Sequence, residues 1–129
     1  MSKCMTARPS APVLWSVALV ALALALFQAL PAGADAVSGK LAYEHGRYDE
    51  ALANWRPAAE RGDAEAQFSL AVMYYEGKGV ETDWVQAYVW FARAYANGYK
   101  LAGQMVSVLA RRLGADQLQH AQQLLQSKS

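Results

Sequence analysis

The side chains best suited to binding a partner are aromatic residues at helical spacing in the second half of the chain. Trp84, Tyr88, Phe91 and Tyr95 follow one another at spacings of four, three and four, which places them along one side of a helix. Such side chains supply large contact areas and often dominate the energetics of interfaces. Packing in the core is the alternative use of the stripe, above all for Phe91 and Tyr88, whereas Trp84 and Tyr95 are harder to place inside a domain.

A second group of apolar residues precedes this stripe. Phe68, Val72 and Tyr75 lie at positions i, i+4 and i+7, and Gln104 and Val108 stand 36 residues after the first two. If these residues come from the first helix of two successive helical hairpins, they line a shared groove, and we expect partner binding there. Packing between the hairpins is the alternative, because a short array buries much of each helix.

The titratable residues predict no catalytic or metal chemistry. His45 and His120 have no partner spaced for metal ligation or for activating a nucleophile. Glu60, Asp63 and Glu65 stand at a helix junction, where carboxylates cap helices and interact favourably with the helix dipole. We therefore expect a protein that is not an enzyme and that uses no metal and no cofactor.

These residues belong to a repeat with an offset of 36 residues. Ala51, Ala58, Gly62 and Ala66 recur as Ala87, Ala94, Gly98 and Ala102, and the aromatic Trp55 recurs as Phe91. A repeat of this length, built from small and aromatic residues, indicates stacked helical hairpins, since one hairpin alone cannot bury its apolar face.

The pattern along the chain predicts six helices and no strand. Asp63 and Asp83 are placed to cap helices, Gly62 and Gly98 to end them, and Pro57 to bend the helix that contains it. The expected helices cover residues 37–45, 48–62, 63–76, 83–97, 100–113 and a last segment that opens at residue 116.

Residues 63–102 resemble the Sel-one-like repeat (SLR), a relative of the tetratricopeptide repeat. The matching positions are Ala66, Leu70, Tyr74, Gly77, Gly79, Val80, Asp83, Ala87, Trp90, Phe91, Ala94, Gly98 and Ala102. Ala71 and Arg93 depart from it, at positions where the family usually has glycine and lysine. Residues 42–62 look like a tetratricopeptide-style opening hairpin, and residues 110–126 are similar to a closing helix. The resemblance implies an all-α superhelical repeat of about three hairpins with a C-terminal capping helix, which binds proteins or peptides and has no shared catalytic centre.

The first 34 residues have the pattern of an export signal. Lys3 and Arg8 precede an apolar run over residues 13–30, and small residues follow Pro31. We expect cleavage after Ala34, with Ala36 as the second choice. The alternative is an uncleaved anchor, because these 18 residues, apolar apart from Ser16 and Gln28, are just long enough to span the ~30 Å hydrocarbon layer.

Cleavage would leave one repeat domain, residues 35–129. Loss of Lys3 and Arg8 lowers the basic residues from 12 to 10, against 11 acidic residues, so nothing favours nucleic-acid binding. The leading hypothesis is an exported, periplasmic or secreted scaffold that binds a protein or peptide partner in the bacterial envelope. The alternatives are a cell-wall glycan binder or hydrolase accessory, and an assembly factor held in the membrane by residues 13–30; self-association is a further possibility.

Overall fold

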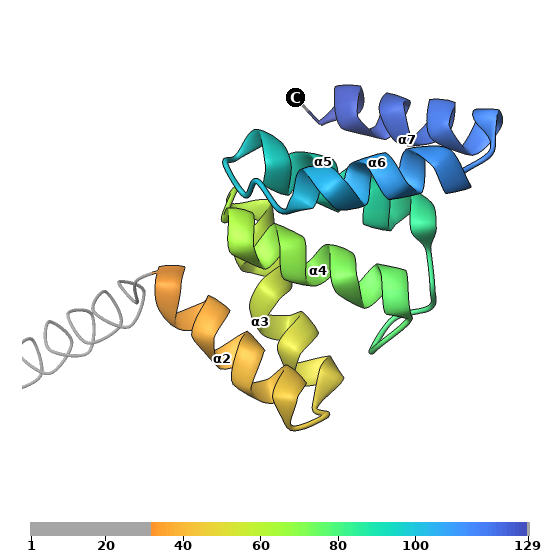
Figure 1. Cartoon of the computed structure of the whole chain (residues 1–129). Coiled ribbons are helices and arrows are strands. Elements are labelled where there is room, and N and C mark those ends of the chain that lie inside the picture. Colours follow the sequence, from red (N-terminus) through yellow and green to blue (C-terminus); the bar gives the residue numbers. More distant parts are fainter. Residues whose placement is uncertain (1–31, 129) are drawn as a thin grey trace, which may run out of the picture. The chain divides into compact units, whose positions relative to one another are not determined.

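The computed structural model describes residues 32–128, and this part of the chain consists of helices without a strand (Figure 1). The helices are α2 (Ala32–Glu44), α3 (Tyr48–Glu60), α4 (Ala64–Glu76), α5 (Trp84–Ala96), α6 (Ala102–Arg112) and α7 (Ala115–Ser127). None of them is long and apolar enough to cross a membrane. The apolar run over residues 13–30 lies outside the described residues.

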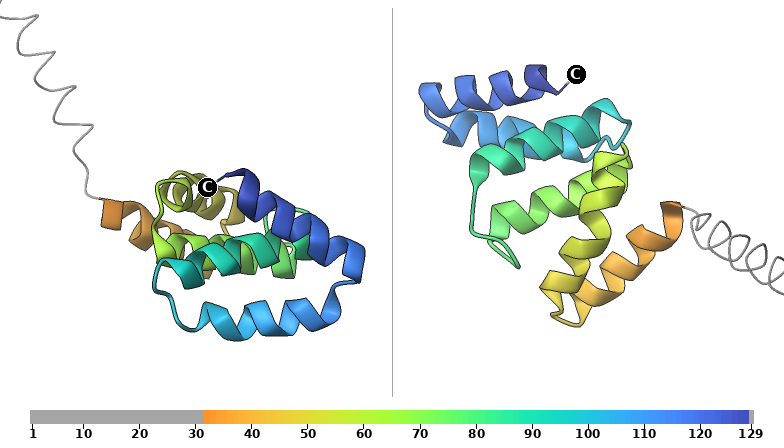
Figure 2. Two further views of the ribbon diagram at one scale, coloured as in Figure 1. Left: turned by 90° about the horizontal axis from the view of Figure 1, so that it is seen from above. Right: turned by 180° about the vertical axis from the view of Figure 1, so that it is seen from behind.

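The helices stack as successive hairpins, as the repeat predicts. α2 packs against α3, α3 against α4, and α4 against α5. α6 and α7 both pack against α5, on different sides of it (Figure 2). The matched small residues lie where these helices touch, since Ala51, Ala58, Ala87 and Ala94 are completely buried. Side chains this small let the helix axes approach closely, which leaves room for the large rings of the neighbouring helix.

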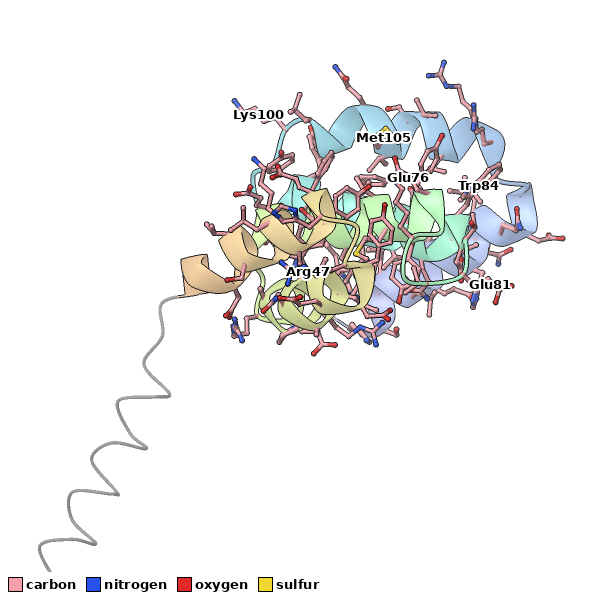
Figure 3. All side chains as sticks on the ribbon, turned by 90° about the horizontal axis from the view of Figure 1, so that it is seen from below. Arg47, Glu76, Glu81, Trp84, Lys100 and Met105 are labelled. Carbon is pink, nitrogen blue, oxygen red and sulfur yellow. The ribbon has the colours of Figure 1, made fainter. Side chains whose placement is uncertain are left out.

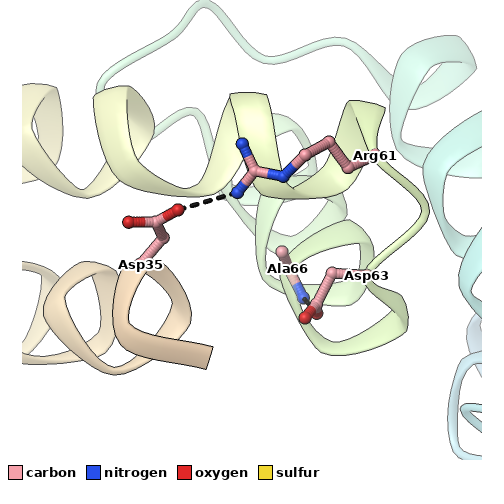
Figure 4. A network of polar contacts seen from close by, with 4 residues as sticks. All are labelled: Asp35, Arg61, Asp63 and Ala66. Atoms are coloured by element: carbon pink, nitrogen blue, oxygen red, sulfur yellow. Dashed lines mark hydrogen bonds and ion pairs between the residues drawn. The ribbon is translucent and has the colours of Figure 1, made fainter. Parts of the chain in front are cut away.

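The corners between helices follow the local sequence signals. Gly62 and Gly98 have φ angles of 97° and 100°, a region that glycine enters without strain. Asp63 caps α4 by accepting a hydrogen bond from the Ala66 amide at 2.8 Å (Figure 4). Asp83 caps α5 in the same way, at 3.0 Å from the Gln86 amide nitrogen. The expected helix beginnings at these two aspartates are confirmed.

The first hairpin departs from the expectation in its opening helix. α2 begins at Ala32, five residues before the expected Val37, and so includes both expected cleavage positions. Leu41 of this helix is exposed, whereas Gly39 and Ala42 are buried. The reason is Trp55, whose ring lies over Gly39 and whose Nε1 donates a hydrogen bond to the Ala36 carbonyl oxygen at 3.2 Å.

Two further details concern the helix bounds. α3 is helical through Pro57, whose carbonyl oxygen accepts from the Arg61 amide at 3.1 Å. α6 begins at Ala102, two residues later than expected. The residues just before it form a turn, in which the Ala102 amide donates to the Tyr99 carbonyl oxygen at 3.0 Å.

Candidate partner-binding surfaces

The three candidates on α4 pack on their neighbours more than they face solvent. Phe68, Val72 and Tyr75 are half-buried and lie against the hydrophobic core. The Phe68 ring contacts Phe91 at 5.3 Å and Tyr99 at 4.6 Å between ring centroids. Phe68 therefore connects α4 to α5 and to the turn before α6. Its contacts agree with packing between the hairpins, which is the alternative to partner binding for these residues.

Tyr75 instead belongs to an aromatic cluster that reaches the surface. Its ring stacks with Trp84 at 6.3 Å, and its hydroxyl accepts a hydrogen bond from Arg112 Nη1 at 3.2 Å. The Arg112 guanidinium also lies 5.7 Å from the Trp84 ring centroid, within reach of a cation–π interaction. The cluster thus joins α4, α5 and the end of α6, and Trp84 remains 39% exposed.

The other aromatic candidates on α5 divide between core and surface. Tyr88 is 8% exposed and its side chain lies in the core, whereas Tyr95 is 56% exposed. The Tyr95 ring rests on α6 at Gly103, where a Cβ would lie 2.9 Å from ring carbon Cε2. Gln104 is exposed and lines the same hollow as Tyr95, while Val108 is half-buried. The structure thus brings Tyr95 and Gln104 together.

These two surfaces lie at opposite ends of the α5–α6 pair (Figure 3). Figure 3 shows Lys100, which lines the hollow of Tyr95, at one end of the α6 side and Trp84 at the other. The hollow at Tyr95 measures about 440 Å³, and the one beside Trp84 measures about 270 Å³. Asp83 is the one carboxylate that lines either hollow among residues 32–128. The pair of carboxylates that glycoside hydrolysis requires is therefore not found in these linings.

An open groove of about 780 Å³, which the sequence did not predict, lies between α3, α5 and α7. Trp90 and Arg93 line it, and the Arg93 guanidinium lies 4.8 Å from the Trp90 ring centroid. At its end, the buried Gln67 donates to the Ala59 carbonyl oxygen at 3.0 Å and accepts from Asn97 Nδ2 at 2.9 Å. The spacing of three between Trp90 and Arg93 was the available sequence signal, because residues three apart are neighbours on a helix.

A polar network ties α2 to the turn after α4. The Tyr43 hydroxyl donates to Glu76 Oε2 at 2.7 Å and accepts from Lys78 Nζ at 3.1 Å, and Lys78 pairs with Glu76 at 2.9 Å. Burial and the bond to Glu76 raise the pKa of Tyr43, while the hydrogen bonds from Tyr43 and Lys78 lower the pKa of Glu76. The pKa of Lys78 is raised, chiefly by its bond to Tyr43. At neutral pH each group therefore keeps the protonation state that it has in water. The network holds α2 against the turn after α4.

Potential metal ligands do not gather in the described part of the chain. No set of three His, Cys, Asp or Glu side chains within residues 32–128 is placed to hold a metal ion. His45 and His120 are exposed, on α2's end and on α7 respectively.

Comparison with known proteins supports the repeat architecture. No family model matches the chain, and no curated protein shows significant similarity to it. A solved structure does: the crystal structure of c5321, a protective antigen present in uropathogenic Escherichia coli strains and displaying an SLR fold. The match has a TM-score of 0.59 and 28% sequence identity, and it covers 76% of this chain but 30% of that one. The described residues thus form a short SLR-type solenoid, a class of repeat scaffold that is typically non-catalytic and serves protein interaction.

Proposed function

We propose that this protein is an exported, non-catalytic repeat scaffold that binds a protein or peptide partner in the bacterial envelope. The observation that carries the proposal is the SLR-type solenoid itself, since stacked hairpins present extended surfaces for other chains. Support comes from the rings of Trp84 and Tyr95, which remain exposed although the domain is small and needs large side chains for its core.

Export is tested by the mass of the protein recovered from the cell envelope. Cleavage after Ala34 gives a chain that begins at Asp35, whose carboxylate accepts from Arg61 Nη2 at 2.7 Å (Figure 4). The expected result is the mass of residues 35–129 in the periplasmic or secreted fraction. A mass that retains residues 13–30, with the protein in the membrane fraction, would assign it instead as a membrane-anchored assembly factor.

Partner binding is tested by capture from a periplasmic extract with variants at the exposed candidates. Tyr95→Ala combined with Gln104→Ala alters the α5–α6 hollow and leaves the core in place. Gln122→Ala combined with Gln123→Ala on α7 is the matched control, since both glutamines are exposed. The proposal expects a protein that is retained by the wild type and the control and is lost from the double variant. Failure of the wild type to retain any protein or peptide would contradict the scaffold function.

Binding of a cell-wall glycan is the second candidate, favoured by the exposed ring of Tyr95, because aromatic rings stack well on sugars. Trp84 is less available, since Tyr75 and Arg112 already contact its ring. Sedimentation with insoluble peptidoglycan tests this candidate. Co-sedimentation that Tyr95→Ala abolishes would replace the protein partner by a glycan.

A further inference from the structure

The first helix of the solenoid leaves two large apolar side chains uncovered at its surface. Val37 and Leu41 stand at i and i+4 on α2 and are 62% and 51% exposed. They line an open hollow of about 460 Å³ between α2 and the beginning of α4, which we call the α2–α4 hollow. It extends along α2 from Ala36 to Glu44, about 12 Å at the rise of an α-helix, which is two turns.

The charged residues of the α2–α4 hollow are mainly acidic. Glu44, Asp63 and Glu65 line it together with one cation, Lys40. Of these four, none forms an ion pair with another residue of the described chain. Asp63 also caps α4, whose N-terminus carries about half a positive charge. Three carboxylates, one ammonium and this dipole leave a net charge of about −1.5 beside the two apolar side chains.

We propose that the α2–α4 hollow binds a basic amphipathic helix of a partner protein. Apolar side chains of that helix would cover Val37 and Leu41, and its lysines or arginines would face Glu44 and Glu65. Charge complementarity selects this occupant. An anionic membrane surface would be repelled by the carboxylates, and a neutral glycan would gain no charge attraction from them. The inference rests on the proposed function, because it names the chemistry of the partner.

Two synthetic helical peptides, added to the exported protein, test the inference by fluorescence anisotropy. Both have about 14 residues, or about four helical turns, with Leu at i and i+4 and Ala elsewhere on that side. One carries Lys on its other side and the second carries Glu at the same positions. The Lys peptide should bind, more weakly as the salt concentration rises, and the Glu peptide should not.

Variants then locate the binding. Glu44→Gln with Glu65→Gln should weaken binding of the Lys peptide about fivefold, since exposed charge pairs contribute modestly. Leu41→Ser should also weaken it. Glu60→Gln with Glu81→Gln is the matched control: it removes the same charge from two exposed residues outside the hollow and should leave binding unchanged. Thermal unfolding of each variant verifies that it is folded.

Several outcomes would overturn the inference. If the Lys and Glu peptides bind equally well, charge does not select the partner. The same conclusion follows if the Glu44/Glu65 variant and its control lose the same affinity for the Lys peptide. A dimer that Leu41→Ser dissociates, seen by sedimentation velocity, would assign the α2–α4 hollow to a second copy. If the capture experiment finds a partner while the Lys peptide does not bind, the proposed function stands and this inference fails alone.

Discussion

Gly39 offers a test in which the expected sign of a stability change is reversed by the tertiary structure. In an isolated helix, Gly→Ala stabilises by about 1 kcal/mol, because alanine loses less conformational freedom. Gly39, however, is buried under the indole of Trp55. An added Cβ would overlap Nε1 of that ring and lie 2.7 Å from Cε2. Gly39→Ala should therefore destabilise the domain.

The magnitude follows from three contributions. Overpacking a filled site costs about 1–3 kcal/mol. Displacing the indole also breaks the bond from Trp55 Nε1 to the Ala36 carbonyl oxygen, worth about 1 kcal/mol. Set against the helix-propensity gain of about 1 kcal/mol, the net loss is about 2 kcal/mol. For a domain of this size, that corresponds to a fall in Tm of roughly 8–16 °C.

Urea and thermal unfolding, followed by far-ultraviolet circular dichroism, measure this loss. Ser38→Ala is the control on the same helix: Ser38 is exposed, and its replacement should raise stability by a few tenths of a kcal/mol. In a Trp55→Phe background, Gly39→Ala should cost much less, since the clashing indole is gone. A Gly39→Ala protein as stable as the wild type, or more stable, would refute this account of the α2–α3 contact.

Other positions give further tests. Gln67→Ala removes a buried amide that bonds α3, and urea unfolding should show a loss of about 2 kcal/mol. Gly79→Ala should lower Tm more than Gly46→Ala: both glycines have positive φ, but only at Gly79 would a Cβ meet Tyr48, at 3.0 Å. The lowered pKa of Glu76 stabilises the fold above the ordinary value of 4.5, and this contribution is lost as pH falls through the lowered pKa. Glu76→Gln should therefore flatten the decline of Tm below about pH 4.5; an unchanged decline would contradict this.

The helices were predictable where their ends are encoded locally. Asp63 and Asp83 bond to amides three residues ahead, and Gly62 needs a positive φ, so each of these residues marks its boundary without reference to the rest of the chain. The buried side of α2 was not predictable in this way. It depends on where Trp55 lies in the next helix, and hydrophobicity alone favoured Leu41 over Gly39.

The binding surfaces were less predictable than the helices. The difficulty of burying Trp84 and Tyr95 was visible in the sequence, and both are exposed. The groove between α3, α5 and α7 was not visible, because the helix ends that form it, such as Glu60, Asn97 and Lys128, are separated by more than thirty residues. Only the stacking of hairpins brings such positions together. The local spacing of Trp90 and Arg93 indicates that these two residues are neighbours, but it does not indicate a groove beside them.

The two ends of the solenoid differ in a way that locates its uncovered apolar surface. At the C-terminal end, α7 packs on α5 and exposes polar side chains such as Gln119 and Gln123, as expected of a helix that closes a repeat array. On α2, the exposed side includes the apolar Val37 and Leu41 beside the polar Ser38, Lys40 and Glu44. Since an exposed apolar surface reduces solubility unless something covers it, Val37 and Leu41 favour a partner on α2.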